Sequence, residues 1–218
     1  HREKVEVEVV AGGRPYGDVR ITTKHELGHA LGLGHDDDPA HIMSDSIEDR
    51  LPAYERRVDV LDTFGNAWAG RNEGAREYEV AVERWNDGRF AESVSAFEAS
   101  AERYREAGAS VATAKELAAA FEGMERPETV DHASLRRSFR SAGEWVEIAA
   151  ERSTLMADAA SVRADGDVGT ARKHRAEAQE RRDRLRDAEF PAPIVVADAL
   201  GLGREGIQPG VDGTTEEG

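Results

Sequence analysis

The chain has 218 residues, and its 44 acidic residues outnumber its 29 basic residues, which gives a formal net charge of −15. A charge of this sign repels phosphate groups, so the composition argues against nucleic acid and against an anionic membrane surface as partners. The chain has no cysteine, which excludes disulfides, iron–sulfur clusters and thiolate-bound zinc. No apolar stretch approaches the roughly 18 residues that a membrane span needs.

Arginine greatly outnumbers lysine among the basic residues. Lysine occurs at positions 4, 24, 115 and 173 only, and every other basic residue is arginine. An acidic, lysine-poor composition is typical of a salt-loving organism, so we interpret the charge as adaptation to the solvent. Because the sequence begins at His1 and not at methionine, we expect a processed or truncated piece, with any targeting segment upstream.

The first 43 residues mix strand and helix patterns. Valines at positions 5, 7 and 9 alternate with glutamates, which predicts a half-buried strand, and residues 12–15 predict a turn. The spacing then becomes helical over 19–31, and Gly32 and Gly34 are expected to end this helix. An acidic turn at 36–39 leads to a short segment that ends at Met43.

Beyond Pro52 the pattern is almost entirely that of amphipathic helices. We predict helices over 54–86, 89–107, 110–126, 131–164 and 168–189, separated by Asp-Gly, Gly or Pro breaks. The arginine-rich run 181–186 is interleaved with acids and is interpreted as a solvated helix face. The apolar segment 194–196 receives no assignment, and the Gly-rich 201–218 predicts a disordered tail.

The segment 25–35 reads His-Glu-Leu-Gly-His-Ala-Leu-Gly-Leu-Gly-His. Residues four apart lie on one face of a helix, so His25 and His29 can both reach one zinc ion, which binds imidazole nitrogen at about 2.0–2.1 Å. Glu26 projects beside them and can accept a proton from metal-bound water. On a continued helix His35 would lie about 9 Å further along, so the chain has to turn back at Gly32.

This segment resembles the extended zinc motif of the metzincins, in the Gly-rich form of the matrixins, the matrix metalloproteinase group. His41-Ile42-Met43-Ser44 resembles the Met-turn of that family. The resemblance implies Zn²⁺ as the cofactor, with His25, His29 and His35 as metal ligands, Glu26 as the general base and Met43 as the turn methionine. It also implies an α+β metzincin catalytic core. Only 24 residues precede His25, so we expect this core to be partial, with most of its sheet missing.

Residues near the motif have less specific patterns. His41 is interpreted as a solvated loop residue, and the acids at 36–38 as a solvated turn in which Asp36 is the best partner for a metal ligand. Tyr16 and Tyr54 are possible oxyanion donors that the sequence does not place near zinc.

The helical half has a resemblance of its own. Asp87-Gly88-Arg89-Phe90-Ala91-Glu92-Ser93, followed by Phe97, resembles the turn and second helix of a tetratricopeptide repeat. Such helical hairpins bind peptides or act as spacers, and a plain bundle without a partner is equally compatible with the pattern.

We therefore predict three regions: the metzincin part over 1–53, a helical hairpin region over 54–190 and a largely disordered tail over 191–218. The predicted function is a zinc-dependent endopeptidase that acts on a peptide or protein substrate, in which Glu26 activates a metal-bound water. The alternative is a helical protein-interaction module with a non-catalytic zinc site. By resemblance the protein is expected outside the cell or at its surface.

Overall fold

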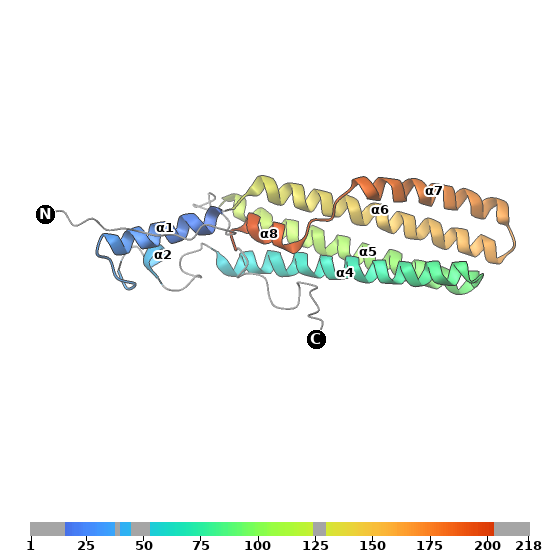
Figure 1. Cartoon of the computed structure of the whole chain (residues 1–218), viewed down its shortest axis with the longest axis horizontal. Helices are drawn as coiled ribbons and strands as arrows, with labels where there is room; N and C mark the ends of the chain where they lie inside the picture. Colours follow the sequence, from blue (N-terminus) through green and yellow to red (C-terminus); the bar gives the residue numbers. More distant parts are fainter. Residues whose placement is uncertain (1–15, 38–39, 45–52, 124–129, 203–218) are drawn as a thin grey trace. The chain divides into compact units, whose positions relative to one another are not determined.

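The structure, a computed structural model, describes residues 16–37, 40–44, 53–123 and 130–202. Most of these residues lie in helices (Figure 1). The helices are α1 (Tyr16–Ala30), α2 (Ala40–Met43), α4 (Tyr54–Asn86), α5 (Phe90–Ala119), α6 (His132–Ala164), α7 (Val168–Asp187) and α8 (Pro193–Leu200), with a 3₁₀ turn, η1 (Ala120–Gly123), after α5. Within these ranges no residue is in a β-strand.

The chain divides into two compact units. Unit 1 comprises His1–Asp62, Lys115–Arg136 and Pro193–Gly218, and unit 2 comprises Thr63–Ala114 and Arg137–Ala192. The long helices α4, α5 and α6 therefore each contribute one end to unit 1 and the rest to unit 2. The candidate metal ligands lie in unit 1.

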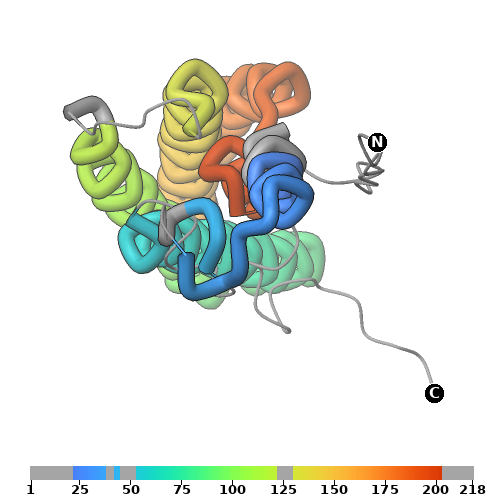
Figure 2. Tube along the Cα trace, turned by 90° about the vertical axis from the view of Figure 1, so that its left-hand side faces the viewer, coloured from blue at the N-terminus to red at the C-terminus, as the bar shows by residue number. Residues whose placement is uncertain are grey.

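Unit 2 consists of parts of α4, α5 and α6 together with α7, which pack side by side (Figure 2). Small residues allow the close approaches between them. Gly70 of α4 faces Ala107 of α5, and Gly108 of α5 faces Val146 of α6. The buried Ser100 and Ser153 hydroxyls lie 3.0 Å apart and link α5 to α6. This pattern satisfies buried polar groups within an otherwise apolar core.

The core of unit 2 is built mostly from alanine with a few aromatic rings. A cluster of Ala81, Ala96, Phe97, Ala157 and Ala160 is almost fully buried. Aromatic side chains such as Tyr78 and Trp85 pack against it. Alanine has the best helix propensity and allows short distances between helices, so a chain with few aromatic residues can still form a tightly packed bundle.

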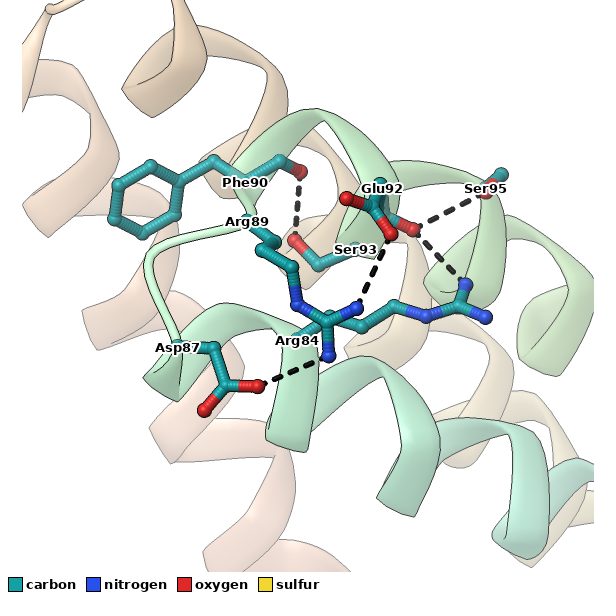
Figure 3. Close-up of polar contacts among 7 residues, drawn as sticks. All are labelled: Arg84, Asp87, Arg89, Phe90, Glu92, Ser93 and Ser95. Carbon is teal, nitrogen blue, oxygen red and sulfur yellow. Dashed lines mark hydrogen bonds and ion pairs between the residues drawn. The ribbon is translucent and has the colours of Figure 1, made fainter.

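The turn between α4 and α5 is held by polar contacts (Figure 3). Gly88 adopts a φ of 77°, which glycine tolerates without a Cβ clash. Arg89 then donates to Asp87 at 2.9 Å and to Glu92 at 3.2 Å (Figure 3). The predicted Asp-Gly break is therefore a tight reversal between two long helices.

The α6–α7 connection uses the same device with a side-chain cap. Gly166 has a φ of 90°, and the Asp167 carboxylate accepts hydrogen bonds from the backbone nitrogen of Thr170 at 2.9 Å and from its hydroxyl at 2.6 Å. This N-cap satisfies otherwise unpaired backbone N–H groups at the start of α7.

Unit 1 encloses a buried arginine. Arg57 is only 1% exposed and donates from Nη1 to the backbone oxygen of Leu200 in α8. Its guanidinium carbon lies 5.7 Å from the centre of the Phe121 ring. Burial lowers the pKa of Arg57 to about 10. The segment 194–196, which had no sequence assignment, lies in α8 and contributes the fully buried Val196.

Two fold expectations are wrong. The α+β metzincin core is not present in the described residues, which are almost entirely helical and contain no strand. The strand predicted from the valines at 5, 7 and 9 lies outside the described residues. The tetratricopeptide resemblance also fails, because α4 has 33 residues and α5 has 30, whereas a whole two-helix repeat takes about 34.

Candidate metal centre

Three histidine side chains converge in unit 1. His25 and His29 lie on α1, one helical turn apart, and His35 lies in the loop that follows α1. The Nε2 atom of His29 is 3.1 Å from Nε2 of His25 and 2.9 Å from Nε2 of His35. One nitrogen from each of the three rings lies within 4.8 Å of the others. The structure therefore brings together the three residues that the sequence selected as metal ligands.

The turn that returns His35 to α1 begins at Gly32. This residue has a φ of 90°, a conformation that favours glycine. The Gly32 backbone N–H donates to the His29 carbonyl at 2.9 Å, and the Leu33 N–H donates to the Gly28 carbonyl at 3.1 Å. These bonds satisfy carbonyls at the end of the helix. The role predicted for Gly32 as the break before the third histidine is confirmed.

The loop has a second support that the sequence did not single out. The backbone N–H of Gly34 donates to the carboxylate of Asp37 at 2.7 Å. This bond closes the loop around His35. Sequence reasoning favoured Asp36 among the three acids, but Asp37 stands three residues after a glycine N–H, a spacing typical of a side chain that accepts from a turn.

The outer nitrogens of the two helical histidines are fixed by backbone carbonyls. Nδ1 of His25 lies 2.7 Å from the Ile42 carbonyl oxygen, and Nδ1 of His29 lies 2.9 Å from the Leu33 carbonyl oxygen. A carbonyl only accepts, so each Nδ1 carries the proton and donates it. In the neutral ring Nε2 is then an acceptor with a free lone pair.

This donor set fits a metal ion. Two neutral Nε2 acceptors about 3 Å apart repel one another unless a cation or a proton lies between them. Two nitrogens bound at 2.0–2.1 Å to one tetrahedral zinc would lie about 3.3 Å apart, close to the 3.1 Å and 2.9 Å separations here. Backbone carbonyls that orient ligating histidines are a usual feature of metal sites. Three histidines could thus form a metal site, and the arrangement itself does not identify the metal.

Met43 packs against α1, the helix that carries His25 and His29. It is the last residue of α2 and is fully buried. A Cβ added at Gly28 would lie 2.1 Å from the Met43 sulfur, so only glycine leaves room at this position between His25 and His29. The same short helix supplies the Ile42 carbonyl that orients His25. The segment predicted as a Met-turn is thus a short helix against the ligand-bearing face of α1, and its assignment to that role stays a prediction.

Of the other candidate residues selected from the sequence, the structure describes the side chains of some and not of others. Glu26 follows His25 on α1 and is half-buried, and Asp36 is exposed next to His35. Tyr54 begins α4. The side chains of Tyr16 and His41 are outside the part of the chain that the structure describes. The general-base role of Glu26 therefore stays a prediction.

The comparisons with known proteins found no relatives. No protein-family model, no curated protein and no solved structure matches this chain. The identification as a truncated matrixin-like metzincin is wrong on these findings: no family match supports it, and the described residues lack the mixed sheet and helix of that fold. What survives is the set of three histidines. None of the helices in the described ranges is long and apolar enough to cross a membrane.

Proposed function

We propose that the chain is a helical protein-interaction module that carries a zinc site at His25, His29 and His35. The observation that carries the proposal is the convergence of three Nε2 atoms whose rings are oriented by backbone carbonyls or by the loop after Gly32. Imidazole ligands suit zinc, copper, nickel and iron. Zinc is the choice because three histidines with one position left open are a usual ligand set for zinc.

The interaction role is supported by two exposed leucines at the end of α1, the helix that carries His25 and His29. Leu27 on α1 is 49% exposed, and Leu31, the first residue after α1, is 83% exposed. The Leu31 backbone N–H donates to the Leu27 carbonyl at 3.1 Å, so the two residues lie about one turn apart. Apolar side chains that stay exposed together mark surfaces that other proteins cover. A metal that fixes the loop after α1 would hold this surface in one conformation.

The metal part of the proposal is tested by calorimetric titration of the chelator-treated full chain with zinc, cobalt, nickel and copper salts. We expect one zinc per chain for the native protein and for His132→Ala, which removes a histidine that begins α6 in the same unit. For His29→Ala we expect the affinity to fall at least about a hundredfold, since even changes around metal ligands cost 10–100-fold. Equal affinity in His29→Ala and His132→Ala would refute the site.

The interaction part is tested with a photo-crosslinking amino acid placed at position 31 or, as a control, at Val168, which is 44% exposed on α7. We expect a discrete crosslinked partner from position 31 that disappears in the His29→Ala background, and none from position 168. Crosslinks that are the same from both positions, or that persist without the metal site, would contradict the role of this surface.

A second candidate function is metal-dependent peptide hydrolysis. It is favoured because only three ligand residues group together in the described part of the chain, whereas structural zinc sites are usually closed by four protein ligands. A zinc ion held by His25, His29 and His35 would supply a Lewis acid that can polarise a carbonyl and lower the pKa of water. Glu26, next to His25, would accept the proton.

Hydrolysis is tested with casein and a quenched fluorescent peptide library in high salt. We expect zinc-dependent cleavage by the full chain and by His132→Ala, and at least a hundredfold slower cleavage by Glu26→Gln, in line with the contribution of general bases. Cleavage that is unchanged in Glu26→Gln, or absent from the zinc-loaded native chain, would leave the non-catalytic module as the function.

A further inference from the structure

Unit 2 contains a groove of about 680 Å³ whose lining is rich in arginine. The cationic side chains come from three helices: Arg71 from α4, Arg152 from α6, and Arg182 and Arg186 from α7. The run 181–186, interpreted from sequence as a solvated face, thus supplies two of the four. Arg181 does not face this groove and instead pairs with Glu151 at 2.6 Å.

Three of these arginines have no carboxylate partner within the described part of the chain. Arg71 donates to the Asn72 side chain at 2.8 Å, and its buried Nε has no partner. The guanidinium carbon of Arg152 lies 4.0 Å from the Tyr78 ring centre. Arg182 has one long contact, 3.5 Å, to the Gln179 side chain.

This lack of partners contrasts with other arginines of the same unit. Arg89, Arg103 and Arg105 each pair with at least one carboxylate. Acids outnumber basic residues by 44 to 29 in this chain, so carboxylates are abundant. Asp187 and Glu189 also line the groove, yet neither is within ion-pair distance of Arg71, Arg152 or Arg182. The groove therefore keeps guanidinium groups available to an external anion.

The field of these groups reaches neighbouring hydroxyls. Burial raises the pKa of Tyr78, and the charges of Arg152, Arg182 and Arg175 act in the opposite direction. Burial likewise raises the pKa of Tyr104, and the charges of Arg71 and Arg152 oppose it. Positive potential is thus concentrated at this part of a strongly acidic molecule, where it would attract and hold an anion.

Aromatic and aliphatic side chains form the other part of the lining. Trp145 and Phe190 line the groove with their ring centres 5.8 Å apart, and Leu185 lies beside them. The guanidinium carbon of Arg71 is 4.8 Å from the Trp145 ring centre. Guanidinium groups bind carboxylate and phosphate oxygens through paired hydrogen bonds. The aromatic rings favour contact with a flat apolar part of a ligand.

We propose that this groove binds a small ligand that carries a carboxylate or phosphate group on an aromatic or similarly flat apolar body. The oxyanion would lie among Arg71, Arg152 and Arg182, and the apolar body against Trp145 and Phe190. Pockets of this kind combine apolar walls with a few polar groups that fix the orientation of a ligand. The inference concerns unit 2 and is independent of the histidine site in unit 1.

The test is calorimetric titration of the full chain, at fixed salt, with phenyl phosphate and benzoate as probes and with inorganic phosphate and acetate as their counterparts without a ring. We expect saturable 1:1 binding of at least one aromatic anion, tighter than that of its counterpart. The stronger of the two aromatic probes then distinguishes a phosphate from a carboxylate ligand.

The matched variants are Arg182→Gln and Arg172→Gln. Both residues are exposed on α7, so the two changes alter the net charge equally, and only the first changes the groove lining. We expect Arg182→Gln to weaken binding about tenfold or more, the effect of losing a charge-assisted hydrogen bond, and Arg172→Gln to leave it unchanged. Saturable binding of none of the four probes, or equal weakening by both variants, would overturn the proposal and leave the arginines as packing partners of the aromatic rings.

Discussion

At the scale of single residues, Gly28 is the position where α1, which carries two of the metal ligands, contacts α2, which supports them. It lies between His25 and His29 on α1, and the buried Met43 sulfur occupies the space that a side chain would need. Ile42, which precedes Met43, supplies the carbonyl that orients His25. Moving Met43 would therefore also move a hydrogen-bond partner of a metal ligand. The spacing of the histidines could be predicted from sequence, and the family resemblance singled out Met43. The contact of Met43 with Gly28 could not be predicted, because it joins two separate helices.

We predict that Gly28→Ala weakens zinc binding through its clash with Met43. The added Cβ would lie 2.1 Å from the sulfur, and overpacking of this kind typically costs about 1–3 kcal/mol. Zinc affinity measured for Gly28→Ala, Met43→Ala and the double variant completes a double-mutant cycle. We expect the glycine change to cost less when Met43 is already alanine. Costs that simply add would show that the contact does not support the site.

A second prediction concerns Tyr104, whose pKa is raised by burial to about 12. The ordinary value is about 10, so the neutral ring stabilises the fold fully below pH 10, and this contribution is lost as the pH rises from about 10 to 12. A shift of this size corresponds to about 2–3 kcal/mol.

The measurement for Tyr104 is the free energy of unfolding in urea at several alkaline pH values, for the native chain and for Tyr104→Phe. The difference between the two isolates the tyrosine, because Arg57, with its pKa lowered to about 10, is present in both. We expect the native chain to lose stability relative to the variant above pH 10. A difference in the free energy of unfolding that does not change with pH would contradict the raised pKa of the Tyr104 hydroxyl.

At the scale of elements, the helix boundaries show which sequence signals can be interpreted and which mislead. The helix predicted over 54–86 coincides with α4, and that over 168–189 nearly coincides with α7. The break predicted near Gly108 is absent, and α5 runs on through it. A Cβ on Gly108 would lie 3.3 Å from Val146, so this glycine serves close packing of α5 on α6. Sequence alone does not distinguish a glycine that ends a helix from one that lets a neighbour approach.

Two glycines of α4 test this interpretation. A Cβ at Gly74 would lie 2.8 Å from the Tyr104 ring, whereas one at Gly65 meets nothing within 4 Å. We expect Gly74→Ala to lower the free energy of unfolding by about 1–3 kcal/mol through overpacking, and Gly65→Ala to raise it by up to about 1 kcal/mol through helix propensity. Chemical denaturation measures both, and a stabilising Gly74→Ala would contradict the close approach of α4 and α5.

At the scale of the whole molecule, the net charge of −15 dominates the response to salt. Among the described residues, the ion pairs of unit 2 involve side chains at least 30% exposed, and such pairs contribute little. Screening therefore relieves more repulsion between acids than it weakens attraction. We predict that Tm rises with sodium chloride between about 0.05 and 1 M. Scanning calorimetry with sodium chloride and, as a control, with an uncharged osmolyte would measure this, and a falling Tm would contradict the prediction.

The histidine motif made a metal site predictable, while the scaffold around it was predicted wrongly. A local pattern of three histidines and a glycine specifies a loop that brings three nitrogens together, and the structure places these residues as the pattern requires. The surrounding fold depends on contacts that the motif does not encode, and here the described residues are helices without the expected sheet. The arginine groove was missed because its members come from three helices far apart in the chain.

The most direct test of the account is zinc K-edge X-ray absorption on the full chain loaded with one equivalent of zinc. We predict the scattering of three imidazole rings, with nitrogen at 2.0–2.1 Å as in known zinc sites, and loss of one ring in His35→Ala but none in His132→Ala. Scattering from one imidazole or none, or spectra that do not change in His35→Ala, would contradict the claim that His25, His29 and His35 hold one metal ion.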